Sequence, residues 1–242
     1  MLEPWRTGIV TKIQEETTLT RRFWIQIPEL ETFNFIPGQF VTLDLPIHEK
    51  KNKRWRSYSI ASWPDGTNVI ELVIVFLEGG AGTTYLFNEI KIGSELSLRG
   101  PQGVFVLPEP IDRDLFLICT GTGVAPYRSM LHHIRHNKTP HKNVYLIFGT
   151  RVLKDCLYYN ELKELENNIE NYHYLPTLSR ETGDDKIFRR GYVHAVYEEI
   201  VADSKPEAYF YLCGWKNMVD EAKQRIIALG YDKKSIHLEL YG

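Results

Sequence analysis

The stretch Arg56-Ser57-Tyr58-Ser59 combines side chains that together suit a flat, phosphate-bearing aromatic cofactor. A guanidinium pairs with phosphate through a planar fork. A phenol ring offers an apolar face for stacking, and a serine hydroxyl can donate a hydrogen bond to a ring nitrogen. We therefore interpret the stretch as flavin-binding. The alternative is an ordinary strand, in which Tyr58 and Ile60 face a core while Ser57, Ser59 and the flanking Arg56 face solvent.

A glycine-rich loop, Gly79-Gly80-Ala81-Gly82-Thr83-Thr84, precedes a short predicted helix over residues 85–89. Glycines let the backbone approach a ligand closely, and the amide groups at a helix start favour an anion. The loop therefore suits a phosphate. A glycine-rich turn capped by threonine explains the same residues without a ligand.

A second glycine turn, Thr120-Gly121-Thr122-Gly123-Val124-Ala125-Pro126, follows an apolar run and opens a predicted helix. An open α/β sheet binds nucleotides at such a turn. Pro126 occupies the place of the third glycine of G-x-G-x-x-G, and proline suits a first helical turn because its missing N–H is not needed there. We favour nucleotide binding over a turn without a ligand.

Two further segments bear polar groups close to predicted strand ends. Ser179 and Arg180 could bind a 2′-phosphate, which favours NADP over NAD, with help from Arg189 and Arg190. Exposed basic residues are also common on any solvated face. In the other segment, Cys213-Gly214-Trp215-Lys216-Asn217-Met218 lies between a strand and a helix, and a free cysteine there is typically a small buried apolar residue.

The elements that position these residues change in kind along the chain. Up to about residue 108, short β-branched and aromatic runs alternate with Gly/Pro turns, which predicts an antiparallel barrel or sandwich. The predicted strands there are residues 23–27, 40–45 and 70–75.

Beyond that point, strands alternate with helices, which predicts a parallel, doubly wound sheet. Its predicted strands are residues 115–119, 144–148, 172–175 and 209–213, and its predicted helices are residues 127–136, 159–165 and 217–229. We place the boundary near residues 108–112. This gives a flavin-binding β-barrel domain over 1–110 and a nucleotide-binding α/β domain over 111–242.

Composition excludes several classes of protein. With 43% apolar and 25% charged residues the chain is an ordinary globular one, and a net charge of −2 argues against a general nucleic-acid binder. Three scattered cysteines supply neither a disulfide framework nor the four thiolates of an iron–sulfur cluster, and we expect no metal site. No apolar run is long enough to span a bilayer, and no secretion signal is visible, so we expect a cytoplasmic protein. The oligomeric state stays open.

Five motifs occur in an order that resembles the ferredoxin–NADP⁺ reductase superfamily over nearly the whole chain: R-x-Y-S, G-x-x-[ST], G-P-x-G at residues 100–103, G-T-G-x-x-P and C-G-x-x-x-M. The resemblance implies an N-terminal flavin-binding β-barrel, with FAD favoured over FMN, and a C-terminal α/β domain for NADP(H). It also implies residue roles. Tyr58 would stack on the flavin and Ser59 would bond its N5. The remaining cofactor contacts would come from Arg56, Gly80, Gly82, Thr83 and Thr84 for the flavin phosphates, and from Gly121, Thr122, Gly123, Pro126, Ser179 and Arg180 for the pyridine nucleotide.

The end of the chain gains a role from the same resemblance. Plant-type members end in Glu-x-Tyr, with the acid near the flavin and nicotinamide and the tyrosine covering the flavin, and Glu239-Leu240-Tyr241 matches this pattern. Taken without the resemblance, these residues would be a frayed terminus. Cys213 would lie beside the nicotinamide, which gives a candidate catalytic set of Ser59, Cys213, Glu239 and Tyr241. The chain departs from the pattern by continuing to Gly242.

The resemblance implies that NADPH reduces bound FAD, which passes electrons to an external one-electron carrier such as ferredoxin or flavodoxin. The run from His48 to Arg54 is basic and could steer an acidic carrier, although a solvated loop would look the same. The alternatives are a cytochrome b5 reductase-like enzyme, a free-flavin reductase and a non-catalytic flavin-binding electron-transfer module.

Overall fold

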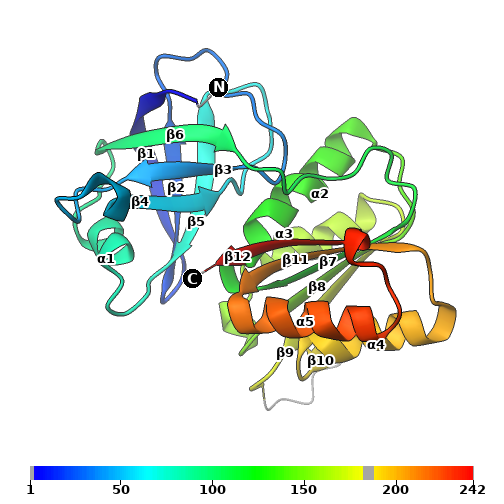
Figure 1. Ribbon diagram of the computed structural model, residues 1–242. Coiled ribbons are helices and arrows are strands. Elements are labelled where there is room, and N and C mark those ends of the chain that lie inside the picture. Colours follow the sequence, from blue (N-terminus) through cyan, green and yellow to red (C-terminus); the bar gives the residue numbers. More distant parts are fainter. Residues whose placement is uncertain (1–2, 182–187, 242) are drawn as a thin grey trace. The chain divides into compact units, whose positions relative to one another are not determined.

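The computed structural model describes residues 3–181 and 188–241 (Figure 1). The chain divides into two compact units. The first unit comprises Met1–Val106 together with Arg128–His133, and the second comprises Leu107–Tyr127 together with Ile134–Gly242. Within the described ranges, no helix is both long and apolar enough to cross a membrane.

The first unit contains a six-stranded antiparallel sheet, with strands in the order β4-β3-β6-β1-β2-β5. Its two outer strands, β4 and β5, approach each other through one isolated bridge between Ile60 and Leu72, so the sheet is barrel-like but not closed by a ladder. A short helix, α1 (Ala81–Asn88), follows β5. The strands are β1 (Trp5–Thr17), β2 (Thr20–Gln26), β3 (Phe40–Asp44), β4 (Trp55–Ser59), β5 (Val69–Val75) and β6 (Glu95–Gln102).

Alternate side chains along the strands of this unit point into its apolar core. In β2, Phe23 and Ile25 are buried while Trp24 between them is only partly covered, as expected of a strand with one face on a core. Side chains from five strands and from Leu86 of α1 meet in one apolar cluster.

The second unit contains a six-stranded parallel sheet, with strands in the order β10-β9-β8-β7-β11-β12. In β7 six of seven residues are buried, as expected of a strand covered on both faces. The strands are β7 (Asp114–Thr120), β8 (Val144–Thr150), β9 (Tyr172–Leu178), β10 (Arg189–Arg190), β11 (Ala208–Trp215) and β12 (Ile236–Tyr241).

Helices α4 (Val193–Ser204) and α5 (Lys216–Ala228) pack on one face of this sheet (Figure 1). Val196 and Tyr197 of α4 and Val219 of α5 join the sheet residues Phe116 and Phe210 in a buried cluster. Helix α2 (Ala125–Asn137) follows a 3₁₀ turn, Gly121–Val124, and helix α3 (Tyr159–Glu164) follows β8.

The two-domain fold class predicted from the sequence is confirmed: an antiparallel barrel-like sheet is followed by a parallel α/β sheet. Differences are local. Of the predicted loop over residues 79–84, only Gly79 and Gly80 precede α1, which already begins at Ala81. Strands β1, β6, β10 and β12 and helix α4 were not predicted.

Candidate functional site

Strand β4 carries the first group of candidate residues. Trp55 and Ser57 are exposed on one side of the strand, whereas Arg56 and Tyr58 are partly buried on the other. Ser59, at the strand end, is 4% exposed. The ordinary-strand alternative placed Ser59 in solvent and is therefore wrong for this residue. A serine hydroxyl this well buried is not expected on a solvated edge strand.

Burial also sets the ionisation of Tyr58. Its ring packs against the core of the first unit, and burial raises the pKa of its hydroxyl to about 12, with Arg56 lowering it in part. The phenol therefore stays neutral at ordinary pH, so its ring offers an apolar face of the kind that stacks on another flat ring.

Helix α1 brings the glycine turn against Arg56. A Cβ added to Gly82 would lie 3.0 Å from Cγ and 3.2 Å from Nε of Arg56. The arginine therefore lies across the first turn of α1, so close to Gly82 that an added Cβ would crowd its side chain. The Arg56 Nη1 atom also donates to the carbonyl oxygens of Lys53 (3.1 Å) and Trp55 (2.8 Å), which fixes the direction of the side chain. Because helix-start amides and a guanidinium both attract anions, the pair forms a cradle suited to phosphate.

The Thr83 hydroxyl makes its hydrogen bonds within the turn itself. Its hydroxyl donates to the carbonyl oxygens of Leu77 and Gly80, both at 3.1 Å, and accepts from the Leu77 amide at 3.1 Å. These contacts close the turn that leads into α1. We therefore assign Thr83 a part in shaping the cradle.

The second glycine turn, Gly121–Val124, packs directly on the end of strand β11. A Cβ on Gly123 would lie 2.4 Å from the carbonyl oxygen of Cys213, so no other residue fits there without moving backbone. Gly214 has a φ of +136° and faces Thr120, whose hydroxyl accepts from the Trp215 amide at 3.4 Å. The chain passes from this turn into α2, which carries proline in its first turn as predicted.

Strand β12 places the end of the chain beside Cys213. In the parallel register of β11 and β12, Cys213 pairs with Glu239 and Trp215 pairs with Tyr241. The frayed-terminus interpretation of Glu239 and Tyr241 is therefore wrong, because both lie in a hydrogen-bonded strand. Gly242 lies outside the described residues. Three of the four candidate catalytic residues thus gather at the carboxyl end of one strand pair, where open α/β sheets bind ligands.

The thiol of Cys213 is fully buried. Burial raises its pKa well above the usual range, Glu239 raises it further, and a hydrogen bond with Tyr241 lowers it in part. Cys213 is therefore a neutral thiol and not a nucleophile. The buried hydroxyl of Tyr127 donates to the Ile118 carbonyl oxygen at 3.3 Å, and its pKa is likewise raised by burial and by the nearby cysteines and Glu239.

A group of exposed arginines lies at the carboxyl ends of neighbouring strands. Ser179 and Arg180 follow β9, and their amides donate to the carbonyl oxygens of Thr150 (3.0 Å), the last residue of β8, and Arg151 (2.8 Å). Arg151 thus joins the predicted pair Ser179 and Arg180. Arg190 of β10 is exposed as well, whereas Arg189 forms an ion pair with Glu199. Arg151 was missed because only the parallel register of β8 and β9 brings it to this edge.

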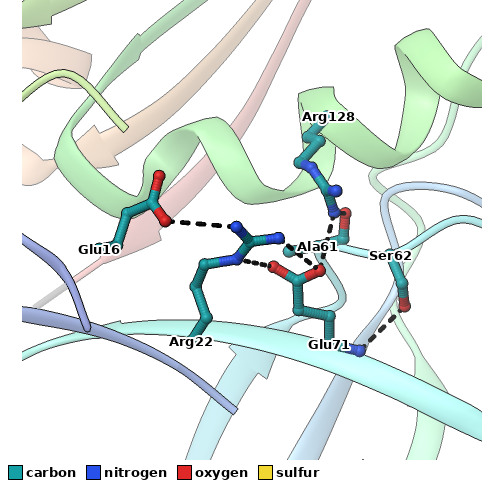
Figure 2. Close-up of polar contacts among 6 residues, drawn as sticks. All are labelled: Glu16, Arg22, Ala61, Ser62, Glu71 and Arg128. Atoms are coloured by element: carbon teal, nitrogen blue, oxygen red, sulfur yellow. Dashed lines mark hydrogen bonds and ion pairs between the residues drawn. The ribbon is translucent and has the colours of Figure 1, made fainter. Parts of the chain in front are cut away.

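A buried ion cluster in the first unit was also missed (Figure 2). Glu71 of β5 is 3% exposed and pairs with both Arg22 and Arg128. A charged residue inside the apolar run of β5 was the available signal. Among the described residues, no group of His, Cys, Asp and Glu could hold a metal ion.

Two family models match successive parts of the chain. Residues 7–107 match the oxidoreductase FAD-binding domain family, and residues 117–224 match the oxidoreductase NAD-binding domain family. The chain is 33% identical to ferredoxin–NADP reductase B of Sorangium cellulosum, over 99% of this chain and 98% of that protein. It is 31% identical to the glycine betaine monooxygenase reductase subunit of Pseudomonas aeruginosa over 96% of this chain, but spans only 63% of that protein.

A solved structure has the same fold. The ferredoxin–NADP⁺ reductase of Neisseria gonorrhoeae, determined with bound FAD and NADP, matches with a TM-score of 0.82 at 21% identity, covering 98% of each chain. The chain therefore belongs to the ferredoxin–NADP⁺ reductase superfamily of FAD-dependent oxidoreductases, which transfer electrons between NAD(P)H and electron carriers.

Proposed function

We propose that the protein oxidises NADPH through bound FAD and passes the electrons to an external one-electron carrier, such as ferredoxin or flavodoxin. The observation that carries the proposal is the arrangement of Cys213, Glu239 and Tyr241 on adjacent strands beside the glycine turn of an NAD-binding domain. The full-length similarity to a ferredoxin–NADP reductase supports the same conclusion.

In the first unit, the residues present fit FAD. The cradle of Arg56 and the first turn of α1, with Gly80 and Gly82, would hold the phosphates. The neutral ring of Tyr58 would stack on the flavin, and the buried hydroxyl of Ser59 would donate to its N5. Bound FAD accepts a hydride from a nicotinamide and returns electrons one at a time, which is chemistry that amino-acid side chains do not supply.

In the second unit, the turn Gly121–Val124 and Pro126 would receive the pyridine nucleotide. Ser179, Arg180 and Arg151 would bind the 2′-phosphate that distinguishes NADPH from NADH, because a guanidinium pairs with a dianion more strongly than with a ribose hydroxyl. This adds Arg151 to the residues that the sequence indicated.

The C-terminal residues would act on the nicotinamide. Cys213 is a neutral thiol at the strand end, so it would offer the ring a soft, uncharged contact. Glu239, one strand away, would place negative charge near the nicotinamide as positive charge forms there on hydride loss. Tyr241 would cover a face of the flavin ring and exclude water.

The basic loop supports an acidic carrier. Lys50, Lys51 and Lys53 are exposed, whereas Arg54 is paired with Asp44 at 2.7 Å and so contributes less free charge. Exposed lysines raise the association rate with an acidic partner, an effect that salt screens.

A second candidate function is that of a reductase component for an oxygenase, which the name of the Pseudomonas aeruginosa relative favours. In both cases NADPH reduces the flavin, and the two differ in the acceptor. A cytochrome b5 reductase-like enzyme or a free-flavin reductase would also differ only there, whereas a non-catalytic flavin-binding module would show no turnover.

The experiment is NADPH-dependent reduction of cytochrome c, measured with and without an added [2Fe–2S] ferredoxin or flavodoxin. The proposal predicts that reduction depends on the added carrier and weakens with salt. Changing Lys50, Lys51 and Lys53 to Glu should raise the KM for the carrier about tenfold and leave reduction of ferricyanide intact. Changing Lys142, Lys233 and Lys234 to Glu, three lysines that are exposed in the second unit, is the matched control. Turnover with free flavin but not with either carrier would contradict the proposal.

A further inference from the structure

The buried ion cluster of the first unit is built around the carboxylate of Glu71 (Figure 2). Arg22 Nε donates to Glu71 Oε1 at 2.6 Å and Arg22 Nη2 donates to Oε2 at 3.2 Å, which makes a forked pair. Arg128 Nη1 donates to the same Oε2 at 3.1 Å. Glu16 Oε2 accepts from Arg22 Nη1 at 3.3 Å. Two acids and two arginines thus form a cluster with no formal net charge.

This cluster is protected from solvent. The side chains of Glu71 and Arg128 are 3% and 5% exposed, and those of Arg22 and Glu16 are 14% and 15% exposed. Burying four charges costs solvation free energy, and hydrophobic side chains would fill the same space at lower cost. Unlike hydrophobic side chains, however, the cluster supplies directed hydrogen bonds.

The cluster holds one short segment of backbone. Arg128 Nη1 donates to the Ala61 carbonyl oxygen at 2.8 Å. The Ala61 amide donates to the Glu71 carbonyl oxygen at 2.8 Å, and the Glu71 amide donates to Ser62 Oγ at 3.0 Å. The backbone of Glu71 therefore holds Ala61 and Ser62 from one side, and Arg128, which the Glu71 carboxylate orients, holds Ala61 from the other.

An aromatic contact extends the same hold to Trp63. The guanidinium of Arg128 lies 5.3 Å from the centre of the Trp63 ring, and that ring stacks on His132 with centroids 3.9 Å apart. Three successive residues, Ala61 to Trp63, are thus fixed by Glu71 and by helix α2.

This segment continues directly from the flavin-binding residues. Ser59 ends β4, and Ile60 then bridges to Leu72, next to Glu71 in β5. Ile60 alone separates Ser59 from the clamped segment, so the backbone position of Ala61 constrains that of Ser59. A displacement of about 1 Å in an active site can lower a rate about 100-fold.

We propose that Glu71 and Arg128 are positioning residues for the flavin: they clamp Ala61 and Ser62 and thereby hold Ser59 and Tyr58 in place. The proposal rests on the proposed function, because it takes Tyr58 and Ser59 to contact FAD. Neither Glu71 nor Arg128 is assigned a contact with the cofactor.

The test compares Glu71→Gln with the wild-type holoprotein. Glutamine keeps the shape of the side chain but removes the charge that both arginines need. Three flavin readouts are taken: the visible circular dichroism of bound FAD, the Kd of the apoprotein for FAD, and the rate of flavin reduction at saturating NADPH. The melting temperature reports stability separately.

Asp114→Asn is the matched control. Asp114, at the start of β7 in the second unit, is also a buried carboxylate, 6% exposed, but it accepts a hydrogen bond from Asn143. Both variants should melt at lower temperature. Only Glu71→Gln should alter the dichroism, raise the Kd for FAD about tenfold and slow reduction at saturating NADPH at least tenfold, with KM for NADPH little changed.

Wild-type values for all three flavin readouts in Glu71→Gln would leave a purely structural role and overturn the proposal. If Glu71→Gln does not fold, Ser62→Ala decides the question, since it removes one hydrogen bond of the clamp. It should alter the dichroism and raise the Kd for FAD a few-fold, and no change in either would overturn the proposal. A wild-type protein that binds no FAD would overturn the proposed function as well, so the two failures are distinguishable.

Discussion

Substituting Gly82 by alanine should separate the stability of the first unit from its ability to bind FAD. Gly82 lies in the first turn of α1 and has no unusual backbone conformation, so alanine fits the helix. The added Cβ would lie 3.0 Å from Cγ of Arg56, which is closer than an ordinary van der Waals contact. The arginine side chain is flexible and must yield by a few tenths of an ångström.

The substitution should raise the stability of the first unit and lower its affinity for FAD. Replacing glycine by alanine in a helix stabilises it by up to about 1 kcal/mol. Displacing Arg56 weakens a charge-assisted bond to phosphate, and losing such a bond costs about 1.5–3 kcal/mol. Since each 1.4 kcal/mol changes an affinity about tenfold, the Kd for FAD should rise by about 10-fold to 100-fold, nearer the lower value for a partial shift.

The assay is titration of the apoprotein with FAD, followed by quenching of the flavin fluorescence, with a thermal melt of the apoprotein in parallel. Arg56→Gln should weaken FAD binding at least as much as Gly82→Ala. Arg54→Gln removes an equal charge from a neighbour that is paired with Asp44, and it should leave the affinity nearly unchanged. Wild-type affinity in Gly82→Ala would refute the cradle of Arg56 against α1.

Three further predictions concern the other parts of the site. Ser59→Ala should slow flavin reduction by NADPH about 10-fold to 100-fold in stopped-flow measurements, and an unchanged rate would remove Ser59 from the mechanism. Gly123→Ala should lower the free energy of unfolding in urea by about 1–3 kcal/mol, because its Cβ would lie 2.4 Å from the backbone oxygen of Cys213; wild-type stability would contradict this packing. Arg180→Ala should raise the KM for NADPH about tenfold and leave that for NADH unchanged in steady-state assays, and equal effects on both nucleotides would argue against a 2′-phosphate contact.

Local patterns accounted for most of the fold. Continuous apolar runs predicted β7, β8 and β11, and the glycine turn before Pro126 predicted the start of α2, because neighbouring residues determine each of these features. Helix α4 was missed although its signal was present. Val193, Val196, Tyr197, Ile200 and Val201 follow the spacing of a helix that buries one face.

The missed parts of the site depend on contacts between distant residues. Arg22 and Arg128 meet Glu71 across 49 and 57 residues of sequence, so no local motif reports the cluster. Arg151 reaches Arg180 only through the register of two parallel strands. Strand β12 is an intermediate case: Leu238 and Leu240 alternate with polar residues as in a strand, but the pairing of Glu239 with Cys213 is set by the sheet.

The most direct test is an anaerobic titration of the purified holoprotein with NADPH and, separately, with NADH, following the flavin absorption band. We predict that about one equivalent of NADPH bleaches the band and that NADH does so only at much higher concentration, because the proposed site for the 2′-phosphate at Arg180 and Arg151 has no counterpart group to bind in NADH. Equal bleaching by both nucleotides would contradict the NADPH preference. A flavin that neither nucleotide reduces would contradict the account as a whole.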